Sequence, residues 1–432
     1  MARAATGLIH HAYRAPGGFD APQPGVFKAS SVFFPSVAAM RSRDWKDRSA
    51  YTYGLHGTPT TYELEARLAH LESGTHCLLA PSGLAAMALV NLALLGTGDE
   101  VLFPDNGYSN NLALARSELK RWGITHQVYD PMDVSDLAKK ISHRTQLVWL
   151  EAAGSVTLEF PDLVALVQLC KSRGVRCALD NTWGAGIAFN AFDLHARQTR
   201  RGGPSTANLS GPAPLGVDLT MHALTKYPNG SGDVLMGSVI TRDAALFKLL
   251  QRTHERLGLG VAANDAEALL RGLPSIHLRY AAHDLAAREL ALWAQTQSAF
   301  VQVLHPALPG SPGHDHWKAL CGDTTAHGSG SASSPGSAES WGQAAGLLSV
   351  VVDPRFDQSQ VDHFCDALTL FRLGYSWGGP ISLVVPYELA QMRVQWPAHL
   401  KRGTVVRLAI GLEHVDDLRA DLAQAVAKAF GT

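Results

Sequence analysis

The stretch Leu179-Asp180-Asn181-Thr182-Trp183 places a carboxylate directly after residues 176–179, a short apolar run that is typical of a buried strand. The same pattern returns at Ala223-Leu224-Thr225-Lys226-Tyr227, where a lysine follows the strand predicted over residues 219–223. Ligands of open parallel sheets bind outside the carboxyl ends of the strands. Both stretches therefore predict an α/β fold with a binding site at its strand ends.

Strands and helices alternate along the chain around these two stretches. This rhythm predicts a mainly parallel sheet with helices on both faces, followed by a smaller C-terminal α+β domain. The strands are expected at residues 76–80, 100–103, 127–129, 146–151, 176–179 and 219–223, and then at 346–352, 381–385 and 405–410. The helices are expected at residues 62–72, 84–95, 109–121, 134–141, 163–173, 265–299, 358–371 and 415–430.

The expected organisation is an N-terminal arm over residues 1–56, a large domain over 57–275 and a small domain over 276–432. Two stretches look inserted. Residues 194–216 are rich in Gly, Pro and Arg, and residues 328–340 are mostly Gly and Ser. Such compositions cannot bury a core, so we expect exposed loops in both places.

The charge balance limits the classes of partner. The chain has 432 residues, with 37 Lys plus Arg against 38 Asp plus Glu, so its formal net charge is -1. This balance argues against a nucleic-acid binder with a strongly basic surface. Only 17% of the residues are charged, against about 25% in typical domains, and such a chain often buries surface between subunits. We expect a homo-oligomer.

The cysteines and the apolar runs indicate a cytoplasmic protein. Five cysteines, an odd number with no CxxC pair, favour a reduced intracellular chain and predict neither a disulfide framework nor a metal site. The N-terminal residues lack the apolar core of a signal peptide. The longest mainly apolar run, residues 84–95, is interrupted by Asn91 and is shorter than the roughly 20 residues that span a bilayer, so no membrane is expected.

Asp180 and Lys226 each have a plain structural interpretation. Asp180 could cap the segment that follows it, and Lys226 could extend its ammonium group into solvent. Taken together, they are the pair that a pyridoxal phosphate enzyme needs. A desolvated lysine is a nucleophile suited to a Schiff base, and an acid keeps the pyridine nitrogen protonated, which makes the ring an electron sink.

A phosphate site is predicted at Ser82-Gly83-Leu84, where a helix begins after the first strand. Backbone N–H groups at a helix N-terminus attract anions, and glycine allows a close approach. The hydroxyl of Thr225 would add a further donor. An ordinary turn between a strand and a helix explains the same residues, and a single glycine does not decide between the two.

Gly374-Tyr375-Ser376-Trp377-Gly378 matches the G-x-S-x-G pattern of serine hydrolases. The context argues against that class, because a nucleophile elbow opens a helix whereas residues 379–383 predict a turn into a strand. The acid of such a triad also precedes the histidine, but here His414 comes before Asp416.

Taken in order, these motifs resemble the cysteine/methionine-metabolism family of pyridoxal phosphate enzymes over nearly the whole chain. The Ser376-Trp377-Gly378-Gly379 segment is similar to the bacterial cystathionine beta-lyases, whereas gamma-cleaving relatives usually carry a different apolar residue at the tryptophan. The motifs that carry the resemblance are Tyr53-Gly54, Gly57-Thr58-Pro59-Thr60, Ser82-Gly83, Tyr108, Asp180-Asn181-Thr182-Trp183, Thr225-Lys226-Tyr227, residues 375–379 and residues 407–413.

The resemblance implies fold type I, with an aspartate-aminotransferase-like large domain, pyridoxal 5'-phosphate as cofactor and a homotetramer with shared active sites. Lys226 is the implied Schiff-base residue, Asp180 holds the pyridine nitrogen, and Tyr108 stacks on the ring and helps to deprotonate the substrate amine. The other implied cofactor contacts are Ser82, Gly83, Leu84, Thr182, Ala223, Thr225 and, from a neighbouring subunit, Tyr53. The implied substrate contacts are Arg407, Ser376, Trp377, Tyr53 and Tyr108.

Arg407 is the implied clamp for the substrate α-carboxylate. A surface ion pair is the alternative, but the apolar strand predicted over residues 405–410 argues against it. One position departs from the family. An arginine that binds the phosphate usually stands two residues after the tyrosine of the YG motif, and here that position is Leu55. We hypothesise that His56 takes over part of its role.

The activity implied by the resemblance is β-elimination on the amino acid L-cystathionine, which releases homocysteine, pyruvate and ammonia. The alternatives are a cystathionine or methionine gamma-lyase and a general cysteine-S-conjugate beta-lyase. A non-catalytic regulator that uses the same fold ranks below them, because no DNA-binding domain or basic arm accompanies the chain.

Overall fold

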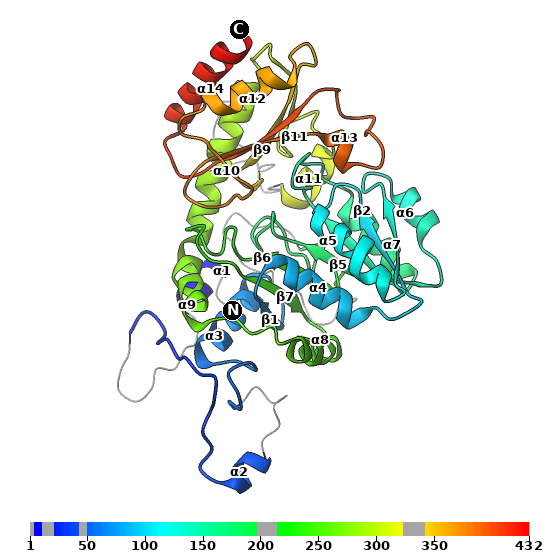
Figure 1. Ribbon diagram of the computed structural model, residues 1–432, viewed down its shortest axis with the longest axis vertical. Coiled ribbons are helices and arrows are strands. Elements are labelled where there is room, and N and C mark those ends of the chain that lie inside the picture. The colour runs from blue at the N-terminus through cyan, green and yellow to red at the C-terminus, as the bar shows by residue number, and fades with distance from the viewer. Residues whose placement is uncertain (1–3, 11–20, 43–49, 197–213, 323–341, 432) are drawn as a thin grey trace, which may run out of the picture.

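The computed structural model describes residues 4–10, 21–42, 50–196, 214–322 and 342–431. Two sheets organise these residues, one of seven strands and one of five. Figure 1 shows the seven-stranded sheet in the lower part of the molecule and the five-stranded sheet in the upper part, with helix α10 (Ile276–Ala294) running between them. The predicted fold class, a large α/β domain with a smaller domain after it, is confirmed.

The first sheet is mainly parallel. Its order is β1-β7-β6-β5-β4-β2-β3, and only β7 runs antiparallel to its neighbours. The prediction missed β7, because its five residues lie close after a Gly-rich loop and carry little periodicity. The strands are β1 (His76–Ala80), β2 (Glu100–Pro104), β3 (Thr125–Tyr129), β4 (Thr145–Glu151), β5 (Arg176–Asp180), β6 (Leu219–Ala223) and β7 (Gly237–Thr241).

Helices cover both faces of this sheet. Helices α4 and α8 pack on one face, whereas α3 and α7 join the core of the other. Alternate residues of each strand point to opposite faces, so Leu150 belongs to one core and Trp149 to the other. The helices up to the second sheet are α1 (Ala4–Ile9), α2 (Val37–Ser42), α3 (Pro59–Leu71), α4 (Gly83–Leu94), α5 (Ser109–Leu114), the π-helix η1 (Ala115–Leu119), α6 (Val134–Lys140), α7 (Leu163–Ser172), α8 (Ala244–Leu257) and α9 (Ala263–Gly272).

The helix predicted over residues 265–299 is wrong in two respects, because the structure divides it and its second part ends at Ala294. Helix α9 ends at Gly272, a single 3₁₀ turn spans Leu273–Ser275, and α10 begins at Ile276. Pro274 explains the break, since proline has no N–H to donate and its ring crowds the preceding turn.

The second sheet has the order β10-β11-β12-β9-β8. Its outer face packs against α10, α12 and α14, and its inner face shares one continuous core with the first sheet. Strand β8 was not predicted. The remaining elements are β8 (Phe300–Leu304), α11 (His314–Cys321), β9 (Leu347–Val352), α12 (Gln358–Ala367), β10 (Arg372–Leu373), β11 (Leu383–Tyr387), α13 (Leu389–Met392), β12 (Val405–Ala409) and α14 (Val415–Phe430).

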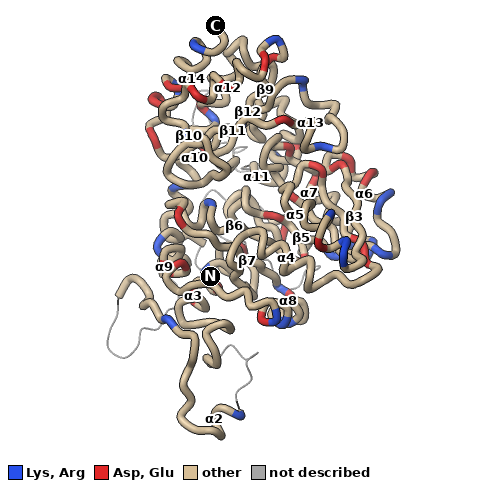
Figure 2. The backbone as a smooth tube through the Cα atoms, viewed as in Figure 1, with Lys and Arg blue, Asp and Glu red and all other residues tan. Residues whose placement is uncertain are grey.

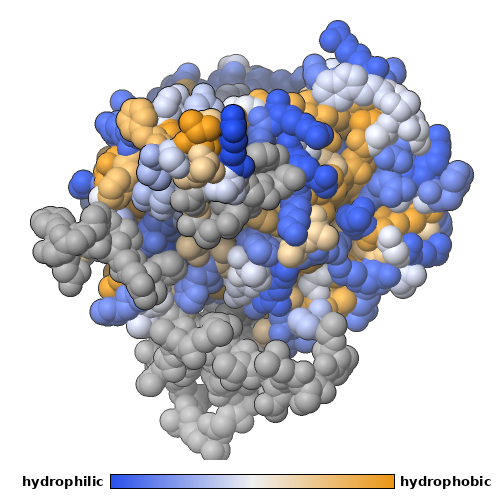
Figure 3. Space-filling model, turned by 90° about the horizontal axis from the view of Figure 1, so that it is seen from below, coloured by the Kyte–Doolittle hydropathy of each residue, from blue (hydrophilic) through white to orange (hydrophobic). Residues whose placement is uncertain are grey.

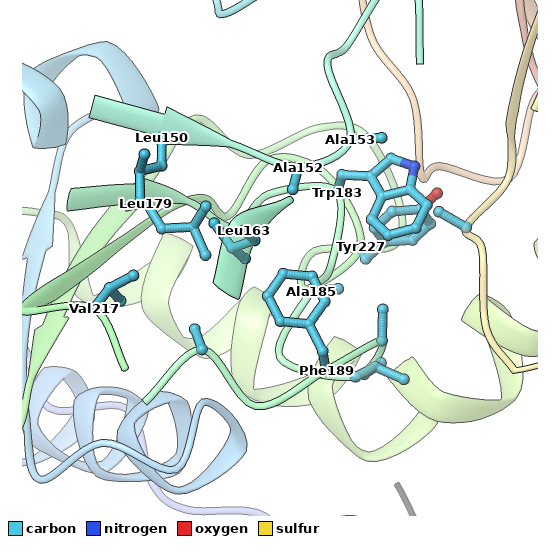
Figure 4. Packing of buried hydrophobic residues seen from close by; sticks show 14 of the residues in the cluster. Leu150, Ala152, Ala153, Leu163, Leu179, Trp183, Ala185, Phe189, Val217 and Tyr227 are labelled. Carbon is cyan, nitrogen blue, oxygen red and sulfur yellow. The ribbon is translucent and has the colours of Figure 1, made fainter. Parts of the chain in front are cut away.

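The shared core supports the strand ends that carry the predicted site. Leu150 of β4 and Leu179 of β5 are register partners, and Figure 4 shows them in the same cluster as Trp183 and Tyr227. Burying such a side chain contributes about 1.5–3 kcal/mol. Residues 180 and 226 are therefore attached to tightly packed, well-fixed strands.

The structure describes part of the first predicted insert and none of the second. The ends of the first one meet, because the Leu194 N–H donates to the Leu215 carbonyl at 2.8 Å. Its residues 197–213 and the whole of residues 328–340 lie outside the described residues. None of the helices in the described part of the chain is apolar over a stretch long enough to cross a membrane.

Residues 21–42 of the N-terminal arm stand away from the body of the molecule, whereas α1 packs against α3 (Figure 1). Within the arm, Phe33 is 94% exposed, and Ser31 forms an isolated bridge with Tyr53. Charged residues gather on the outer helices, among them α6 and α8, while the strands are mostly uncharged (Figure 2). Apolar residues form patches between hydrophilic ones on the face seen from below (Figure 3).

Candidate active site

A cavity of about 830 Å³ lies where the strand ends of the first sheet face the second sheet. Its walls contain Asp180 and Lys226 together with Arg407, although Arg407 is 181 residues beyond Lys226 in the chain. Most of the predicted site residues line this cavity: Ser82, Gly83, Leu84, Tyr108, Asp180, Thr182, Ala223, Thr225, Lys226, Trp377 and Arg407.

Lys226 follows β6 and directs its amine toward the second sheet. Its Nζ donates to Ser376 Oγ at 3.1 Å and lies 4.5 Å from the centre of the Trp377 ring. Burial lowers the pKa of Lys226 to about 8, and the charge of Arg407 acts in the same direction. The lysine does not extend into solvent, and near neutral pH a useful fraction of its amine is unprotonated and nucleophilic.

Asp180 ends β5 and is 8% exposed. Its Oδ1 accepts a hydrogen bond from the Thr182 N–H at 3.0 Å. Burial raises the pKa of Asp180, while the bond from Thr182 and the charges of His222 and Lys226 lower it. Turns rather than a helix follow Asp180 over residues 181–196, and the bond from the Thr182 N–H caps the first of them.

The beginning of α4 forms a cradle beside β6. Ser82 caps the helix, with its Oγ accepting from the Ala85 N–H at 3.0 Å. A Cβ on Gly83 would lie 2.8 Å from the Ala223 Cβ, so only glycine lets the helix end approach the strand this closely. The free N–H groups of a helix start, with Thr225 in the same wall, suit a phosphate group.

Tyr108 precedes α5 and lines the cavity. Its backbone N–H donates to Glu151 Oε2 at 2.7 Å, and its hydroxyl accepts from Asn110 Nδ2 at 2.7 Å. The ring is 40% exposed, so it remains accessible to a group that enters the cavity.

Arg407 lies in β12 and is only 4% exposed. Its Nη1 donates to the Ser155 carbonyl at 3.0 Å, and its guanidinium lies 5.1 Å from the Trp377 ring and 5.3 Å from the Tyr387 ring. Among the residues that the structure describes, no carboxylate pairs with it, and burial lowers its pKa. The surface ion pair is excluded, and a buried guanidinium without a counterion is suited to bind the carboxylate of a ligand.

Ser376 does not open a helix, and residues 374–382 form bends and loops. Its Oγ contacts Lys226, while His414 faces Asp416 at the exposed start of α14. The serine-hydrolase interpretation therefore fails on geometry.

Tyr53 and His56 do not line the cavity of their own chain. His56 contacts Thr52 Oγ1 through its Nδ1 at 2.7 Å, and its Nε2 lies 4.0 Å from Glu255 Oε2. Tyr53 is 44% exposed, with its ring 5.9 Å from that of His56. The two residues lie together on the arm side of the molecule.

Sequence reasoning missed other residues in and around this site. Glu151 ends β4 as Asp180 ends β5, so the strand-end rule could have found it. Ser155 contributes a backbone carbonyl, for which side-chain chemistry gives no signal. The carboxylate of Glu159 pairs with Arg393, which lines the cavity, and with His399. Burial alone would raise its pKa, but the bonds and charges of these two residues lower it to about 2.

The site thus combines a buried amine, an acid at a strand end, a glycine-lined anion cradle and a buried guanidinium. This donor set defines a pyridoxal phosphate enzyme of fold type I. Residues 5–197, 204–328 and 333–427 match the family described as Cys/Met metabolism PLP-dependent enzyme. The chain belongs to this family.

Individual relatives are similar over nearly the whole chain. A cystathionine beta-lyase of Bordetella avium is 35% identical, covering 98% of this chain and 97% of its own. The cystathionine beta-lyase MetC of Escherichia coli K12 is 32% identical, covering 91% of each chain. The crystal structure of a cystathionine gamma synthase from Xanthomonas oryzae, in complex with aminoacrylate and cysteine, superposes with a TM-score of 0.80 at 25% identity, covering 100% of both chains.

Proposed function

We propose that the protein catalyses β-elimination on L-cystathionine, releasing homocysteine, pyruvate and ammonia, as a carbon–sulfur lyase of methionine biosynthesis. The observation that carries this proposal is the position of the Lys226 amine, which donates to Ser376 Oγ and lies beside the Trp377 ring. The guanidinium of Arg407, which pairs with no carboxylate of the described residues, lies against the same ring. The relatives named cystathionine beta-lyase support it.

Pyridoxal phosphate, when bound, supplies the electron sink that stabilises negative charge at the substrate Cα. Lys226 Nζ, as a neutral amine, takes the Cα proton, and the resulting ammonium returns a proton to the thiolate that leaves Cβ. Asp180 holds the pyridine nitrogen in its protonated form. The unsaturated three-carbon amino acid that remains is hydrolysed after its release and yields pyruvate and ammonia.

The residues of the second sheet orient the substrate. Arg407 binds the α-carboxylate, and its contact with the Ser155 carbonyl fixes the direction of the guanidinium. Ser376 holds the Lys226 amine and, with Trp377, closes the wall around the reacting carbon. The anion cradle at Ser82, Gly83 and Leu84 holds the phosphate, together with Ala223 and Thr225. Thr182 supports Ala223, since its Oγ1 accepts from the Ala223 N–H at 3.0 Å.

Product identification tests the proposed activity. With L-cystathionine and the purified holoenzyme, we expect pyruvate and homocysteine in equal amounts. If 2-oxobutyrate and cysteine appear instead, the protein is a gamma-lyase. Turnover of many cysteine S-conjugates with similar kcat/KM would favour the general beta-lyase. A protein that binds the cofactor without turnover of any of them would be the non-catalytic regulator.

We further propose a cytoplasmic homotetramer, divided into the arm, large and small domains at residues 56 and 275, in which Tyr53 completes the site of a neighbouring subunit. Exposed apolar side chains support an oligomer, among them Phe33 on the arm and Leu278 on α10. The position of Tyr53 and His56 outside their own cavity supports a shared site.

The phosphate contribution of His56 is a separate expectation of this arrangement. His56→Ala should weaken cofactor binding about three- to tenfold, the loss of one hydrogen bond. The matched reverse variant, Leu55→Arg, should tighten binding, because it restores a charge next to the phosphate. Titration of the apoprotein with cofactor, followed by absorbance, measures both. Unchanged affinity in His56→Ala would count against the role of this histidine.

A further inference from the structure

We propose that Glu151 is a positioning residue whose two carboxylate oxygens hold the Tyr108 loop and the Ser155 loop in place. This inference rests on the role that the family resemblance implies for Tyr108, namely stacking on the cofactor ring, and on the role proposed above for Arg407. Glu151 itself was not among the predicted site residues, and it lines the cavity.

The geometry of Glu151 is that of a bridge between two loops. It is the last residue of β4, in the middle of the sheet between β2 and β5, and it is 6% exposed. Its Oε2 accepts from the Tyr108 N–H at 2.7 Å, and its Oε1 accepts from the Ser155 N–H at 3.1 Å. One side chain on a fixed strand thereby tethers two residues, Tyr108 and Ser155, that lie 47 positions apart in the sequence.

Each tethered loop leads to one half of the site. Tyr108 lines the cavity and carries the ring that is expected to stack on the cofactor. The Ser155 carbonyl accepts from Arg407 Nη1 at 3.0 Å and thus orients the carboxylate clamp. The loops also touch each other, because a Cβ on Gly154 would lie 2.7 Å from Asn106 Nδ2. A shift of either loop is therefore expected to disturb both cofactor and substrate binding.

The side chain at position 151 must offer two acceptor oxygens, so a carboxylate is required here. Two N–H groups point at the side chain, and a carboxylate has two acceptor oxygens whereas an amide has one. The chain keeps Glu151 in this place although Asp180 is its register partner on β5, which puts two buried carboxyl groups on adjacent strand ends. Burial and the neighbouring Asp180 raise the pKa of Glu151, and the bonds from the Tyr108 and Ser155 N–H groups act against this rise.

The test compares Glu151→Gln with Glu100→Gln. Glu100 is a matched control, because it is also a buried glutamate, 2% exposed, that accepts hydrogen bonds from Ser142, Thr145 and Gln127. It is the first residue of β2 and therefore lies at the amino ends of the strands, away from the cavity. We expect E151Q to raise both the cofactor Kd of the apoprotein and the substrate KM about tenfold, since it removes one of the two tethers. We expect E100Q to lower the melting temperature without changing either constant. Equal cofactor Kd values in the two variants would overturn the proposal.

A double-mutant cycle separates positioning from general damage. If Glu151 acts on the cofactor through Tyr108, E151Q should have little further effect on the cofactor Kd in a Tyr108→Ala background. Additive effects would contradict the proposal. Glu151→Asp keeps two acceptor oxygens and should retain more cofactor affinity than E151Q, and the reverse order would also contradict it. Cofactor affinity does not depend on which amino acid is cleaved, so these results are independent of the product analysis that tests the beta-lyase activity.

Discussion

Lys226→Ala is expected to lower kcat by about 10³- to 10⁴-fold while leaving the fold intact. In the proposed reaction the same Nζ takes the Cα proton and returns one to the leaving thiolate, and a positioned acid or base contributes about 10²–10⁴ to the rate. Removing this side chain deletes both transfers. The lysine is partly desolvated and makes only one direct side-chain hydrogen bond that the structure shows, to Ser376, so little stability is lost with it.

The measurement combines colour and rate. The wild-type holoenzyme should absorb in the visible range and lose this absorbance on reduction with borohydride, whereas the Lys226→Ala variant should not form the reducible link. Lys140→Ala is the control, because Lys140 pairs with Asp136 on α6, away from the cavity. It should behave as the wild type does. A Lys226→Ala protein that keeps both colour and activity would remove the basis of the proposed mechanism.

Arg407→Leu is expected to lower kcat/KM by about 10²- to 10³-fold, mainly through KM. Truncating one partner of a buried, hydrogen-bonded charge pair costs about 2–5 kcal/mol, and the other partner here is the substrate α-carboxylate. Leucine fills much of the same space, so the strand and its neighbours Trp377 and Tyr387 should remain packed. Steady-state kinetics with L-cystathionine measure the effect.

One control identifies the carboxylate as the group that Arg407 binds, and a second measurement follows the charge of Arg407. An amine analogue without the α-carboxylate should bind the wild type and Arg407→Leu equally. The charge of Arg407 also lowers the pKa of Lys226, so its removal should raise that pKa above about 8. The pH at which the apoprotein amine reacts half-maximally would then move upward. Arg407→Leu with unchanged KM would show that another group binds the carboxylate.

The fold was predictable wherever local pattern decides the element. Strand β5 ends in Asp180 and strand β6 ends three residues before Lys226, and both strands appear where predicted. Strand β7 and the break between α9 and α10 were not predicted. Strand β7 follows closely after a glycine-rich loop that hides its beginning, and the break depends on one proline in a region that is otherwise helical.

The candidate site was predictable on the side of the first sheet. Asp180 and Lys226 could be found because strand ends and residue types carry the signal. The position of Glu151 follows the same rule but was overlooked, since a carboxylate that binds only backbone N–H groups resembles no catalytic motif. The position of His56 against Glu255 of its own chain depends on how the arm packs, which the residues around Leu55 do not reveal.

The sequence by itself determined the class of protein, because an acid, a lysine and a glycine-led helix after three strands of one sheet are local features with specific chemistry. Only the tertiary structure decided how these residues meet the second sheet. Arg407 stacks on the Trp377 ring that also receives the Lys226 amine, and the Ser155 carbonyl orients it. Those contacts join residues between 30 and 252 positions apart and depend on packing and on a backbone oxygen, for which the amino-acid sequence contains no separate signal.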